Sequence, residues 1–217
     1  MGQTCCGQPA WNSGFADDAA KVARATLDAL EADAADVVVV PAGSCATMLK
    51  VFWPEMFELT GDHHAAERAR RLGARTYELS AFLDERRRAG EFEVNPLADP
   101  PSIAYHHSCH MLRELRVDEA PVALIEALGC AVVEWADDKR CCGFGGLFSL
   151  KLPEVSVAMA DEKLRSIPAD TELLVGSDGS CLMHLRGRIE HEGRTLSTQH
   201  LAELLASALP ADGGETK

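Results

Sequence analysis

The sequence has too few basic residues to form a nucleic-acid-binding surface. It contains 21 Lys and Arg against 34 Asp and Glu in 217 residues, and its formal net charge is −13 at pH 7. Binding to a phosphate backbone needs a surplus of positive charge, so a nucleic acid is excluded as an expected partner. Long apolar runs are also missing, and residues 1–10 have neither the basic nor the apolar segment of a secretory signal. We therefore expect a cytoplasmic protein without a membrane span.

The sequence also lacks the short motifs of several large enzyme classes. It has no Gly-x-Ser-x-Gly elbow, phosphate-binding loop, dinucleotide fingerprint or His-Glu-x-x-His pair, so no organic cofactor is indicated. What it does contain is enough apolar residues (47%) for a core, and eight cysteines. In a reducing compartment, so many cysteines indicate metal binding or redox chemistry more readily than a disulfide framework.

Six of the eight cysteines belong to an internal duplication. A shift of 136 positions, which is the separation between Cys5 and Cys141, superposes Cys5-Cys6-Gly7 on Cys141-Cys142-Gly143. The same shift superposes Gly43-Ser44-Cys45 on Gly179-Ser180-Cys181. We interpret the chain as two tandem copies of one structural unit.

Both copies show the pattern of a helix followed by a buried strand. In the first copy, the Ala-rich stretch 17–31 contains no proline and favours a helix. The run 37–40 consists of four valines, which indicates a parallel strand that is buried on both faces. In the second copy we expect strands at 102–106, 131–135 and 173–175, and helices at 120–128 and 153–165. The predicted fold is α/β, with two tandem repeats that are each a small, mainly parallel sheet flanked by helices.

A proline-rich stretch at 93–101 is expected to join the two copies. We assign residues 1–95 to the first repeat, 96–101 to the linker and 102–217 to the second repeat. The second copy has Cys109 ahead of its Cys-Cys-Gly motif, and the corresponding position of the first copy would fall before residue 1. We therefore expect the first repeat to be incomplete at its N-terminus.

Four thiols of the second repeat are expected to converge. Cys109, Cys141, Cys142 and Cys181 each lie in a loop at one end of a predicted strand, and loops after parallel strands gather on one side of a sheet. Four cysteine thiolates are a common ligand set for an iron–sulfur cluster. The glycines that follow the cysteine pair have no Cβ, so their backbone can approach a bulky cluster closely.

The first repeat offers three corresponding thiols, which are Cys5, Cys6 and Cys45. Zinc is the main alternative to a cluster at either site, but an adjacent cysteine pair with distant partners is atypical of zinc hairpins. A strained vicinal disulfide and inert buried thiols are further alternatives, and the duplicated spacing argues against inert thiols. Cys130 lies outside both motifs and is expected in the core.

Several histidines lie close to the expected cysteine sites. His106, His107 and His110 flank Cys109, and each is a candidate ligand, proton carrier or hydrogen-bond donor, with His110 the preferred one. His184 lies three positions after Cys181, which on a helix would turn it toward the same site. It is a better candidate ligand than Met48, which occupies the corresponding position of the first copy.

Met48 corresponds to His184 in the first copy, where a weak thioether is more often part of the core. The acidic residues near the cysteine loops could be general bases or solvated loop residues, and no role is assigned to them. They are Asp137, Asp138 and Asp178.

These motifs resemble the cysteine-rich (CCG) domain family, which includes a subunit of heterodisulfide reductase and the iron–sulfur subunit of glycolate oxidase. The similar segments are Cys5-Cys6-Gly7-Gln8-Pro9-Ala10, Gly43-Ser44-Cys45, Ser108-Cys109-His110-Met111, Cys141-Cys142-Gly143-Phe144-Gly145-Gly146 and Gly179-Ser180-Cys181-Leu182-Met183. The resemblance implies a cluster of the 4Fe-4S type in an electron-transfer subunit. It also implies that the protein acts with two sister subunits to oxidise L-lactate to pyruvate, and so allows growth on lactate.

The chain departs from the family pattern at the end of each repeat. The family has Cys-x-x-Cys there, whereas this sequence has Met48 or His184 in the last position. A five-cysteine cluster of the heterodisulfide reductase kind would therefore lack one ligand, and the second repeat is the more complete site. Two other functions fit the same residues: a zinc-binding structural or regulatory partner subunit, and a thiol–disulfide oxidoreductase of the heterodisulfide reductase type.

Overall fold

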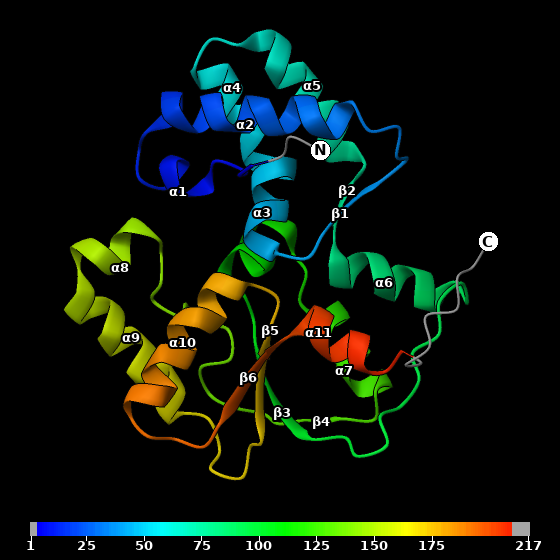
Figure 1. Ribbon diagram of the computed structural model, residues 1–217, viewed down its shortest axis with the longest axis vertical. Coiled ribbons are helices and arrows are strands. Elements are labelled where there is room, and N and C mark those ends of the chain that lie inside the picture. The colour runs from blue at the N-terminus through cyan, green and yellow to red at the C-terminus, as the bar shows by residue number, and fades with distance from the viewer. Residues whose placement is uncertain (1–3, 210–217) are drawn as a thin grey trace.

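The computed structural model describes residues 4–209, which form two groups of elements stacked along the long axis of the molecule (Figure 1). Residues 1–3 and 210–217, at the outer ends of the two expected repeats, lie outside the described part. Each group contains a parallel sheet with helices against it, as the duplicated sequence pattern predicts. The predicted α/β fold of two tandem repeats is confirmed.

The first group consists of helices around a two-stranded parallel sheet, β1-β2. Its elements are α1 (Gln8–Trp11), α2 (Ala16–Glu31), β1 (Val38–Val40), α3 (Gly43–Thr47), the π-helix η1 (Met48–Phe52), α4 (Trp53–Leu59), α5 (His63–Ala74), β2 (Thr76–Glu78) and α6 (Leu79–Arg88). The valine strand forms as predicted, but the prediction that both its faces are buried is wrong. Val38, Val39 and Val40 are only half-buried, because the strand lines a pocket beside the helical core.

The core of the first group lies among helices rather than on the sheet. Leu27 of α2, Trp53 and Phe57 of α4 and Leu72 of α5 are all buried in one cluster. The indole of Trp53 also donates a hydrogen bond of 2.8 Å to the backbone carbonyl of Cys6, so this core holds the first Cys-Cys-Gly loop in place.

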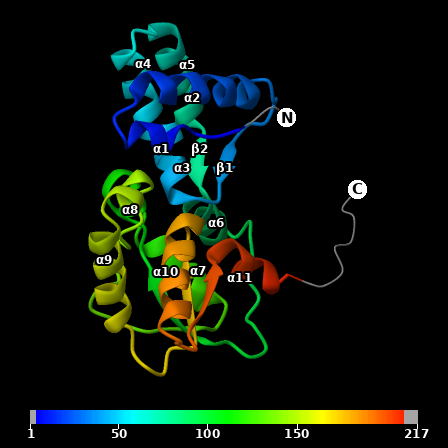
Figure 2. The ribbon, with the colours of Figure 1, turned by 60° about the vertical axis from the view of Figure 1, so that its left-hand side comes forward.

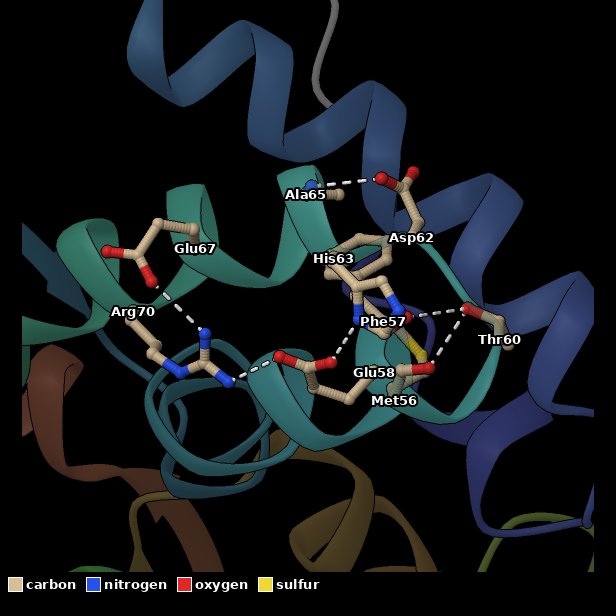
Figure 3. A network of polar contacts seen from close by, with 9 residues as sticks. All are labelled: Met56, Phe57, Glu58, Thr60, Asp62, His63, Ala65, Glu67 and Arg70. Atoms are coloured by element: carbon tan, nitrogen blue, oxygen red, sulfur yellow. Dashed lines mark hydrogen bonds and ion pairs between the residues drawn. The ribbon is translucent and has the colours of Figure 1, made fainter.

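The corner between α4 and α5 is fixed by a polar network (Figure 3). Asp62 caps α5, because its carboxylate accepts a hydrogen bond of 2.9 Å from the backbone N–H of Ala65. Glu58 of α4 pairs with Arg70 of α5 at 2.6 Å and also contacts His63. Thr60 donates to the carbonyls of the last turn of α4. The network ties the C-terminal end of α4 to α5.

The second group has a four-stranded, all-parallel sheet in the order β4-β3-β5-β6. Its elements are β3 (Ser102–His106), the π-helix η2 (Met111–Leu115), α7 (Glu119–Ala127), β4 (Ala131–Val132), α8 (Leu147–Lys151), α9 (Pro153–Arg165), β5 (Leu173–Gly176), α10 (Gly179–His191), β6 (Ser197–His200) and α11 (Leu201–Ser207). The strand expected at 131–135 is shorter than predicted. The helices expected at 120–128 and 153–165 are confirmed as α7 and α9.

Alternate residues of the central strands face two different helical layers. Ile103, Tyr105 and Val175 belong to a core that includes residues of α7 and α11, among them Leu124 and Leu201. Ala104 and Leu174 belong to the opposite core, with residues of α9 and α10. Because side chains alternate along a strand, His106 follows Ala104 onto the α9–α10 face. Cys130 is buried in the α7–α11 core, as expected.

The two groups meet where the N-terminal ends of α3 and α10 approach each other (Figures 1 and 2). Gly43, the first residue of α3, lies so close to the second group that a Cβ would collide with the side chain of Met111. Helix α6 contacts both the strands of the first sheet and α7 of the second group. The linker at 96–101 has no regular secondary structure, and the domain limits drawn there stay a prediction.

Within residues 4–209, none of the helices combines the length and the apolar character that crossing a membrane would need.

Candidate metal centre

The four cysteines of the second repeat come together at the carboxyl ends of its parallel strands. Cys109 follows β3, the pair Cys141-Cys142 lies in the loop after β4, and Cys181 lies in the first turn of α10, after β5. All four line one cavity of about 100 Å³. The convergence that the order of strands and loops predicts is therefore present in the structure.

The thiols of this cavity are close enough to share protons. The sulfur atoms of Cys142 and Cys181 are 3.0 Å apart. Hydrogen bonds from Cys109 and Cys142 hold the pKa of the Cys141 thiol far below its usual range, and the backbone N–H of Gly143 adds a third at 3.4 Å. The same contacts, together with burial, raise the pKa of Cys109 and Cys142. The cavity thus presents four sulfur atoms, a soft donor set that suits zinc, copper(I) or an iron–sulfur cluster.

The structure explains why each Cys-Cys motif is followed by glycine. Gly143 has a φ of 89°, and a Cβ there would lie 2.6 Å from the carbonyl oxygen of Ser156 in α9. Gly7 has a φ of 84°, and its Cβ would lie 2.8 Å from the carbonyl oxygen of Ala19 in α2. In both repeats, therefore, the turn needs a left-handed residue that also packs directly on the second helix after it, and only glycine meets both conditions.

His106 is the histidine that lies among the cysteines. It is 1% exposed, and its ring nitrogen and the sulfurs of Cys142 and Cys181 all lie within 4.8 Å of one another. Neither of its ring nitrogens has a hydrogen-bond partner within residues 4–209. Burial and the nearby charge of Lys163 hold the pKa of His106 well below its usual range, so the imidazole is neutral.

The other candidate histidines contact groups outside the cysteine cluster. His107, the residue after β3, packs edge-on against the ring of Tyr105, and its Nδ1 lies 3.2 Å from the carboxylate of Asp118 without a hydrogen bond among the described residues. His110 lines the cavity but is paired with Glu114 at 3.0 Å. His184 lies 3.2 Å from the hydroxyl of Ser156, which in turn donates a hydrogen bond to the carbonyl of Gly143. His184 therefore contacts the cysteine loop through Ser156.

The first repeat repeats the same local geometry with fewer thiols. The sulfurs of Cys6 and Cys45 are 3.1 Å apart, and the backbone N–H of Gly7 donates to the sulfur of Cys5 at 3.4 Å. A hydrogen bond from Cys6 lowers the pKa of Cys45 and raises that of Cys6. The three thiols line a pocket beside β1. Met48, at the position that matches His184, is fully buried in the core.

Lys163 is a residue near the site that the sequence does not indicate. Its side chain is fully buried, and its Nζ lies 4.5 Å from the centroid of the Trp135 ring. The ammonium donates hydrogen bonds to the backbone carbonyls of Asp137, Asp138 and Arg140, and thereby holds the loop that leads into Cys141. Burial lowers its pKa to about 8. A lysine on an amphipathic helix usually points to solvent, so no local pattern signals this position.

The chain matches the model of the cysteine-rich domain (CCG) over residues 1–50 and 103–186. It is 44% identical to lactate utilization protein A of Shouchella clausii (strain KSM-K16) over 207 residues, which cover 94% of this chain and 83% of that protein. It is 40% identical over 210 residues to lactate utilization protein A 2 of Bacillus cereus (strain AH820), with 96% and 84% of the two chains covered. A third relative, lactate utilization protein A of Exiguobacterium sp. (strain ATCC BAA-1283 / AT1b), is 40% identical over 207 residues, with 94% and 81% covered.

Proposed function

Because this chain belongs to the cysteine-rich (CCG) domain family, and within it to the lactate utilization protein A group, we propose that it is an iron–sulfur electron-transfer subunit in lactate utilization. The complex it serves would oxidise L-lactate to pyruvate and so allow growth on lactate. That oxidation releases two electrons and two protons, and this chain would accept the electrons. Without its partner subunits, this chain would not oxidise lactate.

The observation that carries the proposal is the convergence of four thiols on one cavity in the second repeat. Two features of the structure fit a bulky sulfur-containing group there. The buried imidazole of His106 lacks a partner within the described residues. The backbone N–H of Gly143 donates to the sulfur of Cys141 at 3.4 Å, as expected for a donor to a ligand sulfur. We assign the cluster, of the 4Fe-4S type, to Cys109, Cys141, Cys142 and Cys181.

When bound, such a cluster supplies reversible one-electron transfer, and the residues around it set its potential. The N–H of Gly143 points at the sulfur of Cys141, and a hydrogen bond to a ligand sulfur stabilises the reduced form. The buried ammonium of Lys163 acts in the same direction through its charge. Burial of Cys142 and Cys181 keeps water away from one side of the site.

The partners we propose are two sister subunits of the lactate-oxidising complex, lactate utilization proteins B and C. We place the complex in the cytoplasm. The cysteine motifs fit a reducing compartment, because they indicate metal binding rather than a disulfide framework.

Anaerobic purification followed by iron and acid-labile sulfide assays tests the proposal. The full chain should be brown and contain both, and Cys141→Ser or Cys181→Ser should lose most of the iron and sulfide that the second repeat holds. Cys130→Ala is the matched control, because Cys130 is buried in the other core and should leave the metal content unchanged. Cys6→Ser measures the share of the first repeat. Zinc without sulfide would reject the proposal in favour of a structural or regulatory zinc subunit. Thiol–disulfide activity that survives complete iron removal would reject it in favour of an oxidoreductase that uses the cysteine pair.

A further inference from the structure

The side chain of His106 is directed to the cysteine cavity by the alternation of strand β3. Ala104, two residues earlier, packs in the same core as Cys142 and Cys181, whereas Tyr105 and His107 contact each other on the opposite face. His106 is also the last residue of β3, paired with Gly176 at the end of β5, just before α10 begins. Backbone geometry therefore fixes which of the neighbouring histidines meets the thiols.

The ring of His106 is buried without a hydrogen bond among the described residues, which is unfavourable unless another ligand satisfies it. A buried polar group loses its hydration and normally finds a partner in the fold. The nearest cation cannot serve, because the ammonium of Lys163 already donates to three backbone carbonyls. His184 and Ser156 are likewise engaged with each other. A ring nitrogen of His106 lies within 4.8 Å of the sulfurs of both Cys142 and Cys181.

Two thiols and an imidazole within 4.8 Å of one another form the ligand set of a soft metal site. We propose that a ring nitrogen of His106 is a ligand of the metal centre in the second repeat, beside Cys142 and Cys181. The inference rests on the proposed function, because it takes this centre to be the iron–sulfur cluster. It adds a nitrogen ligand to the four cysteines assigned above, and histidine ligation raises the reduction potential above that of an all-thiolate site.

The test is hyperfine spectroscopy of the reduced, anaerobically purified full chain, grown with natural or ¹⁵N-labelled histidine. We expect a strongly coupled nitrogen whose signal changes with the isotope. This measurement uses the wild-type protein, so its outcome does not depend on a variant that folds. A cluster without a directly bonded histidine nitrogen would overturn the inference and leave the proposed function intact. A chain without iron and sulfide would overturn both.

Variants identify which histidine supplies the nitrogen. His106→Cys keeps a soft ligand at the position, and we expect it to retain iron, lose the nitrogen coupling and have a lower reduction potential. His184→Asn and the exposed His191→Asn are the matched controls, and both should keep the coupling. Loss of the coupling in His184→Asn but not in His106→Cys would overturn the inference.

Discussion

Asp178 of the second repeat accepts a hydrogen bond of 2.5 Å from the hydroxyl of Ser44 in the first repeat. Its carboxylate also accepts from the backbone N–H of Ser44, at 3.2 Å. Asp178 directly precedes α10 but its side chain does not cap that helix, so it caps α3 of the other repeat instead of its own. The two loops that carry Cys45 and Cys181 are thereby tied together.

Removal of this carboxylate should weaken the junction between the repeats. Asp178→Ala leaves the hydroxyl of Ser44 and the first turn of α3 without their acceptor, and we expect a loss of about 1–2 kcal/mol in the free energy of unfolding. Denaturant titration of the metal-free chain measures it, with the exposed Asp36→Ala as control. In a double-mutant cycle, Ser44→Ala should have little further effect once Asp178 is gone. Strictly additive losses would show that the pair is not coupled.

Substitution of the motif glycine should disturb the cysteine loop more than its φ alone explains. Gly143→Ala combines a left-handed conformation with a collision against α9, whereas Gly61 has a φ of 77° and no atom within 4 Å of its missing Cβ. We expect Gly61→Ala to destabilise the protein by about 1 kcal/mol, from the backbone conformation alone. Gly143→Ala should cost clearly more and also lower the iron content. Equal losses in both variants would mean that the close packing on α9 has no energetic role.

Glu78 should make the stability of the protein depend on pH in the acidic range. Its carboxyl is 4% exposed, and burial raises its pKa despite hydrogen bonds from Ser80 and Ala81. A raised pKa means that the folded chain binds this proton more tightly than the unfolded chain. The stability linked to Glu78 is therefore greatest below its unfolded pKa, near 4.5, and falls as pH rises through its folded pKa.

Glu78→Gln should remove this dependence, because an amide can accept the same hydrogen bonds without a charge. The free energy of unfolding of the variant, relative to that of the wild type, should therefore increase as the pH rises from about 4 to neutrality. Chemical denaturation at a series of pH values measures it. Parallel pH profiles of the two proteins would contradict the assignment to Glu78.

The sequence predicts local elements and the convergence of the thiols, because both follow from short patterns. The strand at 102–106 and the helix at 153–165 have the predicted bounds. The polar strand β6 (Ser197–His200) is not predicted, since its residues lack the apolar run that marks a buried strand.

Long-range contacts explain what the sequence does not indicate at the site. Asp178 meets Ser44 across 134 positions, and no local pattern records that contact. The sequence analysis prefers His110 to His106 as a candidate ligand. Strand alternation separates neighbouring histidines, but it does not say which face of the strand holds the cysteines. Because Ala104 packs in the same core as Cys142, the alternation places the side chain of His106 on the face that holds the cysteines.

Lys163 supports the last prediction, because its ammonium both holds a loop and places a charge behind the cysteines. The loop 137–140 supplies three carbonyls to the ammonium and leads directly into Cys141. Lys163→Met keeps the apolar stem but leaves these carbonyls unpaired. We expect a loss of about 3 kcal/mol in the free energy of unfolding, from several buried acceptors without donors. The loaded variant should also have a lower reduction potential, because a positive charge near the cysteines favours the reduced form.

The pH dependence of unfolding separates the charge of Lys163 from its packing. Its pKa is about 8 in the folded chain against an ordinary value of 10.5, so between these values the unfolded chain holds a proton that the folded chain has lost. Wild-type stability should therefore rise relative to Lys163→Met as pH increases from about 8 to 10.5, by about 3 kcal/mol in total. Denaturation of the metal-free, reduced chains across this range measures the difference, with the exposed Lys151→Met as control. A constant difference would show that Lys163 keeps an ordinary pKa in the fold, and that its ammonium is better solvated than its burial implies.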